Sequence, residues 1–184
     1  PFEEVTPEQR SHAKAVNFGI IYGISDFGLA RQLGIPRKQA ASYIEAYFKR
    51  YPSIHDFMHS MVEKAKETGR AVTLFGRYRE LPDINSKNFN RRSFAERTAM
   101  NTPIQGTAAD IMKMAMIEVY KKMKEGGYKS RVLLQVHDEL VAEVVKEEKE
   151  EIAALLKETM ESVVKLKVPL VADVNEGKNW AETK

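Results

Sequence analysis

Apolar residues recur at helical spacing through the N-terminal part of the chain, and glycine and proline interrupt the pattern. The stretches predicted to be helical are residues 7–22, 25–33, 37–50 and 52–68. Thr6 and Pro7 are typical of a helix start, and Gly69 is typical of a helix end. The apolar stripes of the third and fourth helices are expected to form a core.

The middle of the chain combines short extended stretches with a long helical pattern. Residues 71–81 predict two short strands that meet at Gly76. A helical pattern then covers about residues 88–124. We expect a break in this helix, because an interior proline removes a hydrogen bond and clashes with the preceding turn. The residues expected to form the break are Asn101, Thr102 and Pro103.

The C-terminal part contains two β-rich runs, residues 131–136 and 139–145. Only His137 and Asp138 separate them, which predicts a tight hairpin. The elements expected after the hairpin are a helix at residues 147–165 and a last strand at residues 170–174.

These elements indicate an α+β fold with two lobes that divide near residues 101–103. The 184 residues, 43% hydrophobic and 30% charged, are enough for one compact domain or two small lobes. The longest apolar stretches are far shorter than the roughly 20 residues that cross a bilayer, so no membrane partner is expected. The absence of cysteine excludes disulfides, thiolate nucleophiles and Cys-ligated zinc.

The net charge of +3 gives only weak support for a polyanionic partner, but the charges are unevenly distributed. Basic residues outnumber acidic ones in residues 77–97, whereas glutamate dominates residues 146–161. The basic stretch is therefore a candidate for facing phosphate groups, and a merely solvated basic loop explains it equally well.

The first candidate site lies on the first predicted helix, where Arg10, Lys14, Phe18 and Tyr22 recur at every fourth residue. Each residue is about 40° around the helix from the previous one, so all four share one broad face. Two cations followed by two rings suit a ligand with phosphates at one end and a base or sugar at the other. A surface helix with extended cations and half-buried rings gives the same pattern.

The second candidate site is the tip of the predicted hairpin, where Asp138 and Glu139 form a carboxylate pair. Carboxylates on a rigid base are suitable ligands for Mg²⁺. Aspartate is also common in tight turns for purely local reasons. A site for two metal ions needs carboxylates from more than one segment, so this tip alone does not complete one.

The third candidate site is the polar stretch of residues 101–110. The side-chain amide of Gln105 both donates and accepts hydrogen bonds, which suits the acceptors in the minor groove of a nucleic-acid duplex. Thr102 and Pro103 are explained equally well as residues at a helix start.

Together the three stretches resemble the motifs of family A DNA polymerases, the group of the bacterial polymerase I-like enzymes. Residues 10–23 are similar to the fingers-helix motif, residues 101–110 to the palm glutamine helix, and residues 135–139 to the third polymerase motif. The likeness covers essentially the whole chain. It implies a mostly helical fingers lobe at residues 1–98 and the C-terminal part of a palm, with a small antiparallel sheet, at residues 99–184.

The resemblance also implies roles for single residues on the nucleotide side. Arg10 and Lys14 would bind the triphosphate of the incoming nucleotide, and Phe18 would lie against its sugar and base. Tyr22 would stack at the templating position and so contact DNA as well.

For the palm side, the resemblance implies that Asp138 is a metal ligand with Glu139 as an adjacent supporting carboxylate. His137 would lie beside the primer terminus, so that these three residues and the triphosphate-binding lysine form the catalytic set. The residues implied to contact the minor groove of the new duplex are Arg97, Asn101 and Gln105.

The implied enzyme is a cytoplasmic, nucleoid-associated DNA polymerase of replication and repair. Its cofactor would be Mg²⁺, two ions in the complete enzyme, and its partners primer–template DNA and deoxynucleoside triphosphates. The first motif of the family, a strand with a second metal-binding aspartate, has no counterpart here, so we expect this chain to need the N-terminal palm and thumb part and to be inactive alone. A non-catalytic nucleic-acid-binding module is the main alternative, and a metal-dependent nuclease a weaker one.

Overall fold

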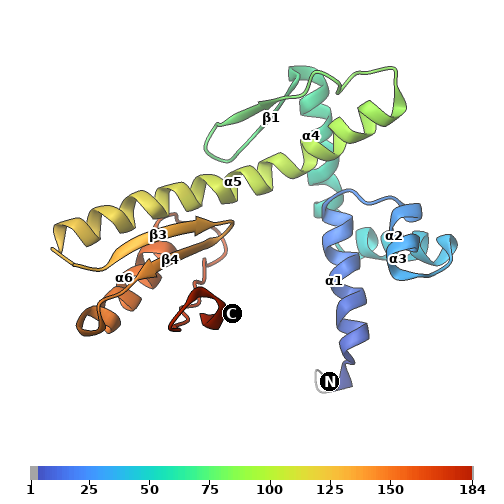
Figure 1. The fold of residues 1–184 in the computed structure, drawn as a ribbon. Helices are drawn as coiled ribbons and strands as arrows, with labels where there is room; N and C mark the ends of the chain where they lie inside the picture. Colours follow the sequence, from blue (N-terminus) through green and yellow to red (C-terminus); the bar gives the residue numbers. More distant parts are fainter. Residues whose placement is uncertain (1–3, 184) are drawn as a thin grey trace. The chain divides into compact units, whose positions relative to one another are not determined.

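A computed structural model describes residues 4–183 and divides the chain into two compact units. The N-terminal unit is Pro1–Gly106 and the C-terminal unit is Thr107–Lys184. Helices predominate, and the strands form two small antiparallel hairpins (Figure 1), which confirms the predicted α+β class. In the described part of the chain, no helix combines the length and the apolar character needed to cross a bilayer.

The N-terminal unit begins with the four helices that the sequence predicts. They are α1 (Pro7–Ile21), α2 (Asp26–Leu33), α3 (Arg37–Arg50) and α4 (Pro52–Thr68). The Thr6 hydroxyl accepts from the Gln9 backbone N–H at 3.1 Å, and the Gln9 side chain accepts from the Thr6 N–H, so the start of α1 has a complete capping box. Gly69 ends α4 with φ 71°, as predicted.

Two apolar clusters hold this unit together. In the first, Leu29 and Ala30 of α2 pack with Ala40 of α3, and Val16 of α1 packs against them. This contact fixes α1 through one side and leaves its opposite side exposed. The second cluster joins α4, the first hairpin and the beginning of the long helix α5, and its members are Ala65, Ala71, Leu81, Ile84, Ala95 and Ala99.

The first hairpin pairs β1 (Arg70–Val72) with β2 (Tyr78–Glu80) in antiparallel register. Residues 73–77 form the connection, in which Gly76 has φ 85°, a value that favours glycine. The two short strands predicted around Gly76 are confirmed.

The long helix α5 (Phe89–Glu125) runs through Pro103 without a break, so the predicted interruption at residues 101–103 is wrong. Packing on both sides of the proline explains the continuity. Ala95 and Ala99 are buried before it, and Ala115 and Val119 are buried after it. Their contacts offset an interior-proline cost of about 3 kcal/mol. The boundary between the two units falls within this helix, after Gly106, while the assignment of fingers and palm remains a prediction.

In the C-terminal unit, β3 (Arg131–Val136) pairs with β4 (Glu139–Glu143), which confirms the predicted hairpin. A 3-10 turn (Lys146–Glu148) leads into α6 (Lys149–Ser162), and a second 3-10 turn (Trp180–Thr183) lies near the end of the chain. Val119 and Met123 of α5 and Ile152 of α6 form the core beneath the hairpin. Figure 1 shows α6 lying along one face of the two strands.

The strand predicted at residues 170–174 is wrong, because these residues have no regular secondary structure. The backbone N–H of Ala172 donates to the carboxylate of Glu161 at 3.0 Å instead of to a neighbouring strand. A β-rich sequence forms a strand only beside a partner, and in the described residues β3 and β4 pair only with each other.

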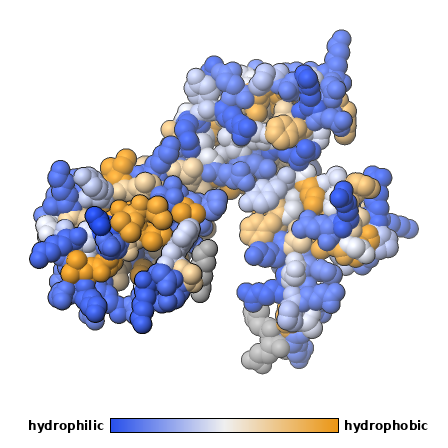
Figure 2. Space-filling model, viewed as in Figure 1, coloured by the Kyte–Doolittle hydropathy of each residue, from blue (hydrophilic) through white to orange (hydrophobic). Residues whose placement is uncertain are grey.

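Apolar side chains gather on one face of the C-terminal unit (Figure 2). The exposed apolar residues of this unit include Leu133 and Val171.

Candidate functional site

The structure brings the first candidate set together on the exposed side of α1. Arg10 and Lys14 are exposed, and Phe18 and Tyr22 retain 47% and 40% of their accessible surface. The centroids of the two rings are 6.3 Å apart, with 30° between their planes. Ile20 is buried and Val16 packs on the core of α2 and α3, so the apolar side of α1 is occupied. The cations and rings are therefore free to meet a ligand.

An open hollow of about 720 Å³ lies in the N-terminal unit beside this face. Its wall contains Lys14 and Phe18 of α1 and the C-cap residue Tyr22, together with Ser93 and Arg97 from α5. Two rings and two cations around an open hollow can stack a base and neutralise phosphate charge.

Gly23, directly after the α1 cap, explains how Tyr22 and Arg97 come to share this hollow. Its φ of 73° lies in the left-handed region. A Cβ at this position would lie 2.6 Å from Cε of Met100 and 3.1 Å from Cγ of Arg97. Only glycine satisfies both the backbone conformation and the close approach of α5.

The three residues proposed to contact a duplex minor groove, Arg97, Asn101 and Gln105, recur at every fourth residue of α5 and lie along one side of it. The Arg97 guanidinium donates to the Ser93 hydroxyl at 2.8 Å, which holds it along the helix. The Asn101 side chain is half-buried, and its Oδ1 has no hydrogen-bond partner among the described residues. Gln105 is exposed, so its amide is accessible to a ligand.

Sequence reasoning missed the contact that supports α5 next to Gln105. Arg77, considered only as a candidate for facing phosphate, donates from Nη2 to the backbone carbonyl of Gly106 at 2.9 Å. Thr73, in the same connection between β1 and β2, is buried against Gly106. The buried threonine could not be recognised from the sequence, because its partner lies far along the chain.

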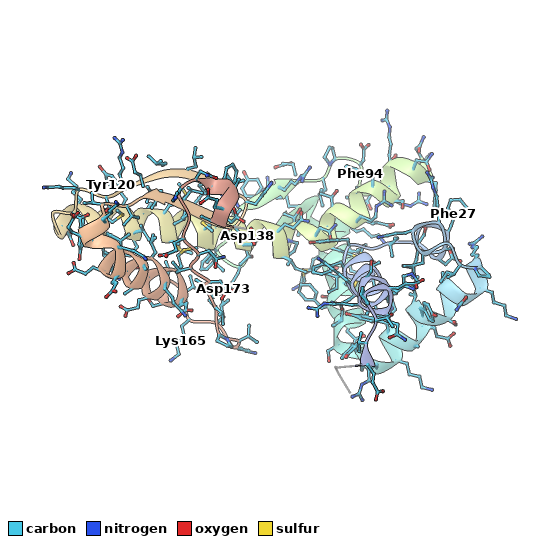
Figure 3. All side chains as sticks on the ribbon, turned by 60° about the horizontal axis from the view of Figure 1, so that its bottom comes forward. Phe27, Phe94, Tyr120, Asp138, Lys165 and Asp173 are labelled. Atoms are coloured by element: carbon cyan, nitrogen blue, oxygen red, sulfur yellow. The ribbon has the colours of Figure 1, made fainter. Side chains whose placement is uncertain are left out.

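Asp138 and Glu139 are both exposed at the hairpin tip. Asp138 is labelled in Figure 3. His137 has φ 53° and is the only non-glycine residue of residues 4–183 with a positive φ. Such a conformation costs about 1–2 kcal/mol, and the Gln135 side chain offsets part of it by donating to the His137 carbonyl at 2.7 Å. A two-residue turn with positive φ at its first residue matches the twist of the two strands, so the hairpin tip has one fixed backbone conformation.

Carboxylate oxygens are the hard donors that Mg²⁺ prefers, so Asp138 and Glu139 fit part of a magnesium site. Within residues 4–183, no cluster of three or more side chains of metal-binding type is present. The tip therefore offers one pair of carboxylates, both from one segment.

The base of the hairpin is held by Glu148. Its carboxylate accepts from the backbone N–H of Lys129 at 3.0 Å, and from the N–H and hydroxyl of Ser130 at 2.9 and 2.6 Å. The same hydrogen bonds, that of Lys129 first, hold the pKa of Glu148 below its ordinary value. Ser130 is buried, and its hydroxyl also accepts from the N–H of Val145 at 3.0 Å. This network ties β3 to the segment that follows β4.

Comparison with known proteins relates these features to one family. The pattern that defines DNA polymerase family A matches residues 1–182. DNA polymerase I of Streptococcus pneumoniae serotype 4 is 57% identical over 182 residues, and that of Geobacillus stearothermophilus is 54% identical over the same number. Each match covers 99% of this chain and 21% of the relative, so the chain spans about a fifth of the curated relatives' length.

A solved structure resembles the whole chain. It is described as the POL domain of Pol1 from M. smegmatis in complex with DNA primer-template and dNTP, and it matches with a TM-score of 0.95 and 44% identity. The match covers 100% of this chain and 32% of that one. By its sequence pattern and its relatives, this chain belongs to DNA polymerase family A.

Proposed function

We propose that this chain is part of a DNA-directed DNA polymerase, with its fingers at residues 1–98 and the C-terminal part of its palm at residues 99–184. The observation that carries the proposal is the open hollow beside α1, where Lys14, Phe18 and Tyr22 meet Arg97 of α5. Membership of family A supports it, and so does a similar structure described as containing primer-template and dNTP.

On the nucleotide side, Arg10 and Lys14 bind the triphosphate through charge-assisted hydrogen bonds. Phe18 lies against the sugar and base of the incoming nucleotide, and Tyr22 stacks at the templating position. The exposure of all four side chains and the separation of the two rings are consistent with these roles.

On the DNA side, Arg97, Asn101 and Gln105 contact the minor groove of the newly made duplex. Every base pair presents acceptor atoms there, so a side chain that donates to them checks the shape of a pair without reading its sequence. The exposed amide of Gln105, whose NH2 group can donate, suits such a role.

In the palm, Asp138 and Glu139 would hold Mg²⁺, and His137 would lie beside the primer terminus. Two bound ions would neutralise charge on the attacking and leaving oxygens. The primer 3′-hydroxyl gives its proton to solvent water and its oxygen attacks the α-phosphate. The new phosphodiester bond forms as the bond between the α-phosphorus and the oxygen bridging to the β-phosphate breaks, and pyrophosphate leaves. Lys14 and Arg10 neutralise the negative charge of the triphosphate as it passes to the leaving pyrophosphate.

We further propose that the chain is inactive alone. The hairpin tip supplies carboxylates from one segment, and a two-metal site needs a second segment. That segment would come from the N-terminal palm and thumb part of the same polymerase, which would act on chromosomal DNA at the nucleoid in the cytoplasm.

The test is a labelled primer-extension assay with Mg²⁺ and all four nucleotides, on the purified chain with and without the N-terminal part as a separate polypeptide. We expect no extension by the chain alone, weak and strongly salt-dependent binding to primer–template, and extension once the complement is added. Extension by the chain alone would contradict the proposed division of the site. Binding that persists while a docked complement restores no extension would favour a non-catalytic binding module.

A further inference from the structure

The connection between β1 and β2 contacts the backbone of α5 at Gly106. Thr73 retains only 7% of its accessible surface. A Cβ added to Gly106 would lie 2.6 Å from Cγ2 of Thr73, well inside van der Waals contact. The two segments are therefore in direct contact, and the absence of a side chain at Gly106 permits it.

The connection is fixed by its own hydrogen bonds. The Thr73 N–H donates to the Arg77 carbonyl at 2.8 Å, and the Arg77 N–H donates to the Thr73 hydroxyl at 3.2 Å. The Gly76 N–H donates to the Thr73 carbonyl at 3.1 Å. Thr73 and Arg77 thus belong to one preorganised turn that meets α5 as a unit.

Arg77 adds a polar contact at the same place, because its Nη2 donates to the Gly106 carbonyl at 2.9 Å. Pro103, three residues earlier, has no N–H to donate to the Ala99 carbonyl, so α5 lacks one of its own hydrogen bonds in the turns before Gly106. An external support has most effect on the position of the backbone where the internal support is reduced.

We propose that Thr73 and Arg77 are positioning residues for Gln105. By holding the neighbouring backbone of α5, they place the Gln105 amide where it can donate a hydrogen bond to the minor groove. The inference rests on the proposed minor-groove role of Gln105. A hydrogen bond weakens steeply with small errors in distance and angle. The turn holds Gly106, the residue next to Gln105. If the contact between the turn and Gly106 shifts, the side-chain amide of Gln105 moves with it.

The test uses the complete polymerase and two primer–templates that differ in one atom. In one of them, 3-deazaguanine replaces a guanine of the duplex near the primer terminus and removes its minor-groove N3 acceptor. The measured quantity is the ratio of single-turnover extension rates on normal and substituted DNA. Both rates come from the same enzyme sample, so a lower folded fraction cancels in the ratio.

The modified position is chosen by scanning the base pairs behind the primer terminus for the largest wild-type ratio. We expect a ratio of about three- to tenfold, the effect of one hydrogen bond. Gln105→Ala should bring it to about one, because the donor is gone. A wild-type ratio of one throughout, or a Gln105→Ala ratio equal to that of the wild type, would contradict the minor-groove role and this inference with it.

Arg77→Ala should reduce the ratio at least halfway toward one on a logarithmic scale. Arg79→Ala is the matched control, because it removes the same charge from the same hairpin and the described residues give Arg79 no hydrogen bond to α5. It should weaken DNA binding in a salt-dependent way and leave the ratio unchanged. If Gln105→Ala abolishes the ratio and Arg77→Ala leaves it at the wild-type value, only the positioning inference is overturned.

Adding a methyl group at residue 106 and removing one at residue 73 tests the steric part of the contact. Gly106→Ala should lower the ratio, because its Cβ meets Cγ2 of Thr73 at 2.6 Å. Thr73→Ser removes that methyl group, keeps the hydroxyl, and leaves Cβ of residue 73 at 3.9 Å as the nearest of its remaining atoms. The double variant should therefore recover most of the wild-type ratio. Failure of the double variant to recover it, with Gly106→Ala impaired, would overturn the inference.

Discussion

Gly23→Ala tests the contact that brings the end of α1 against α5. Two costs combine at this position. An alanine at φ 73° costs about 1–2 kcal/mol in backbone conformation. Its Cβ would also meet Cε of Met100 at 2.6 Å and Cγ of Arg97 at 3.1 Å.

The steric cost is the smaller part, because Met100 Cε is the far end of a flexible side chain. Arg97 is anchored to Ser93 and yields less easily, so we assign about 1 kcal/mol to overpacking, the lower end of the usual range. The sum is a destabilisation of about 2–3 kcal/mol. Displacement of Arg97 should also weaken binding to primer–template.

Gly34→Ala is the matched control. Gly34 ends α2 with φ 67°, and an added Cβ would have no atom within 4 Å. The free energy of unfolding of the Gly34→Ala variant should therefore fall only by the conformational cost, about 1–2 kcal/mol, and its DNA affinity should not change. Urea unfolding of the chain and fluorescence anisotropy of labelled primer–template with the complete polymerase measure the two effects. Equal losses of stability in both variants, with unchanged DNA affinity for Gly23→Ala, would refute the packing argument.

The remaining predictions concern the two candidate sites and the base of the hairpin. Asp138→Asn in the complete polymerase should abolish primer extension and spare duplex binding, and a near-normal extension rate would contradict its metal role. Lys14→Ala should weaken nucleotide use far more than template binding, and unchanged KM and kcat for the nucleotide would refute the proposed role of α1. Since the pKa of Glu148 is lowered by folding, its stabilising effect is present above the ordinary glutamate value, about 4.3, and lost as pH falls through the folded pKa. Glu148→Gln should remove this part of the pH dependence, measured by urea unfolding at about pH 7 and pH 4, and an unchanged dependence would contradict it.

The helices and hairpins could be predicted from the sequence because their signals are local. Thr6 and Gly69 mark helix ends through their own side chain or backbone, and the alternation around His137 and Asp138 requires no distant partner. The two wrong predictions concern elements that depend on distant contacts. Pro103 remains inside a helix because residues on both sides of it are buried, and residues 170–174 form no strand because the described sheet offers them no partner.

The same distinction separates the residues proposed to contact substrates from the residues that position them. Lys14 and Asp138 could be proposed as site residues from residue type and spacing, because they are exposed and contribute little to packing. Substitution there should change activity at almost constant stability. Gly23 and Gly106 act through the space that they leave empty, which no sequence pattern reveals, and substitution there must change both stability and geometry. A variant that loses extension without losing stability thus points to a residue that contacts the substrates, and a variant that loses both points to a residue that positions one.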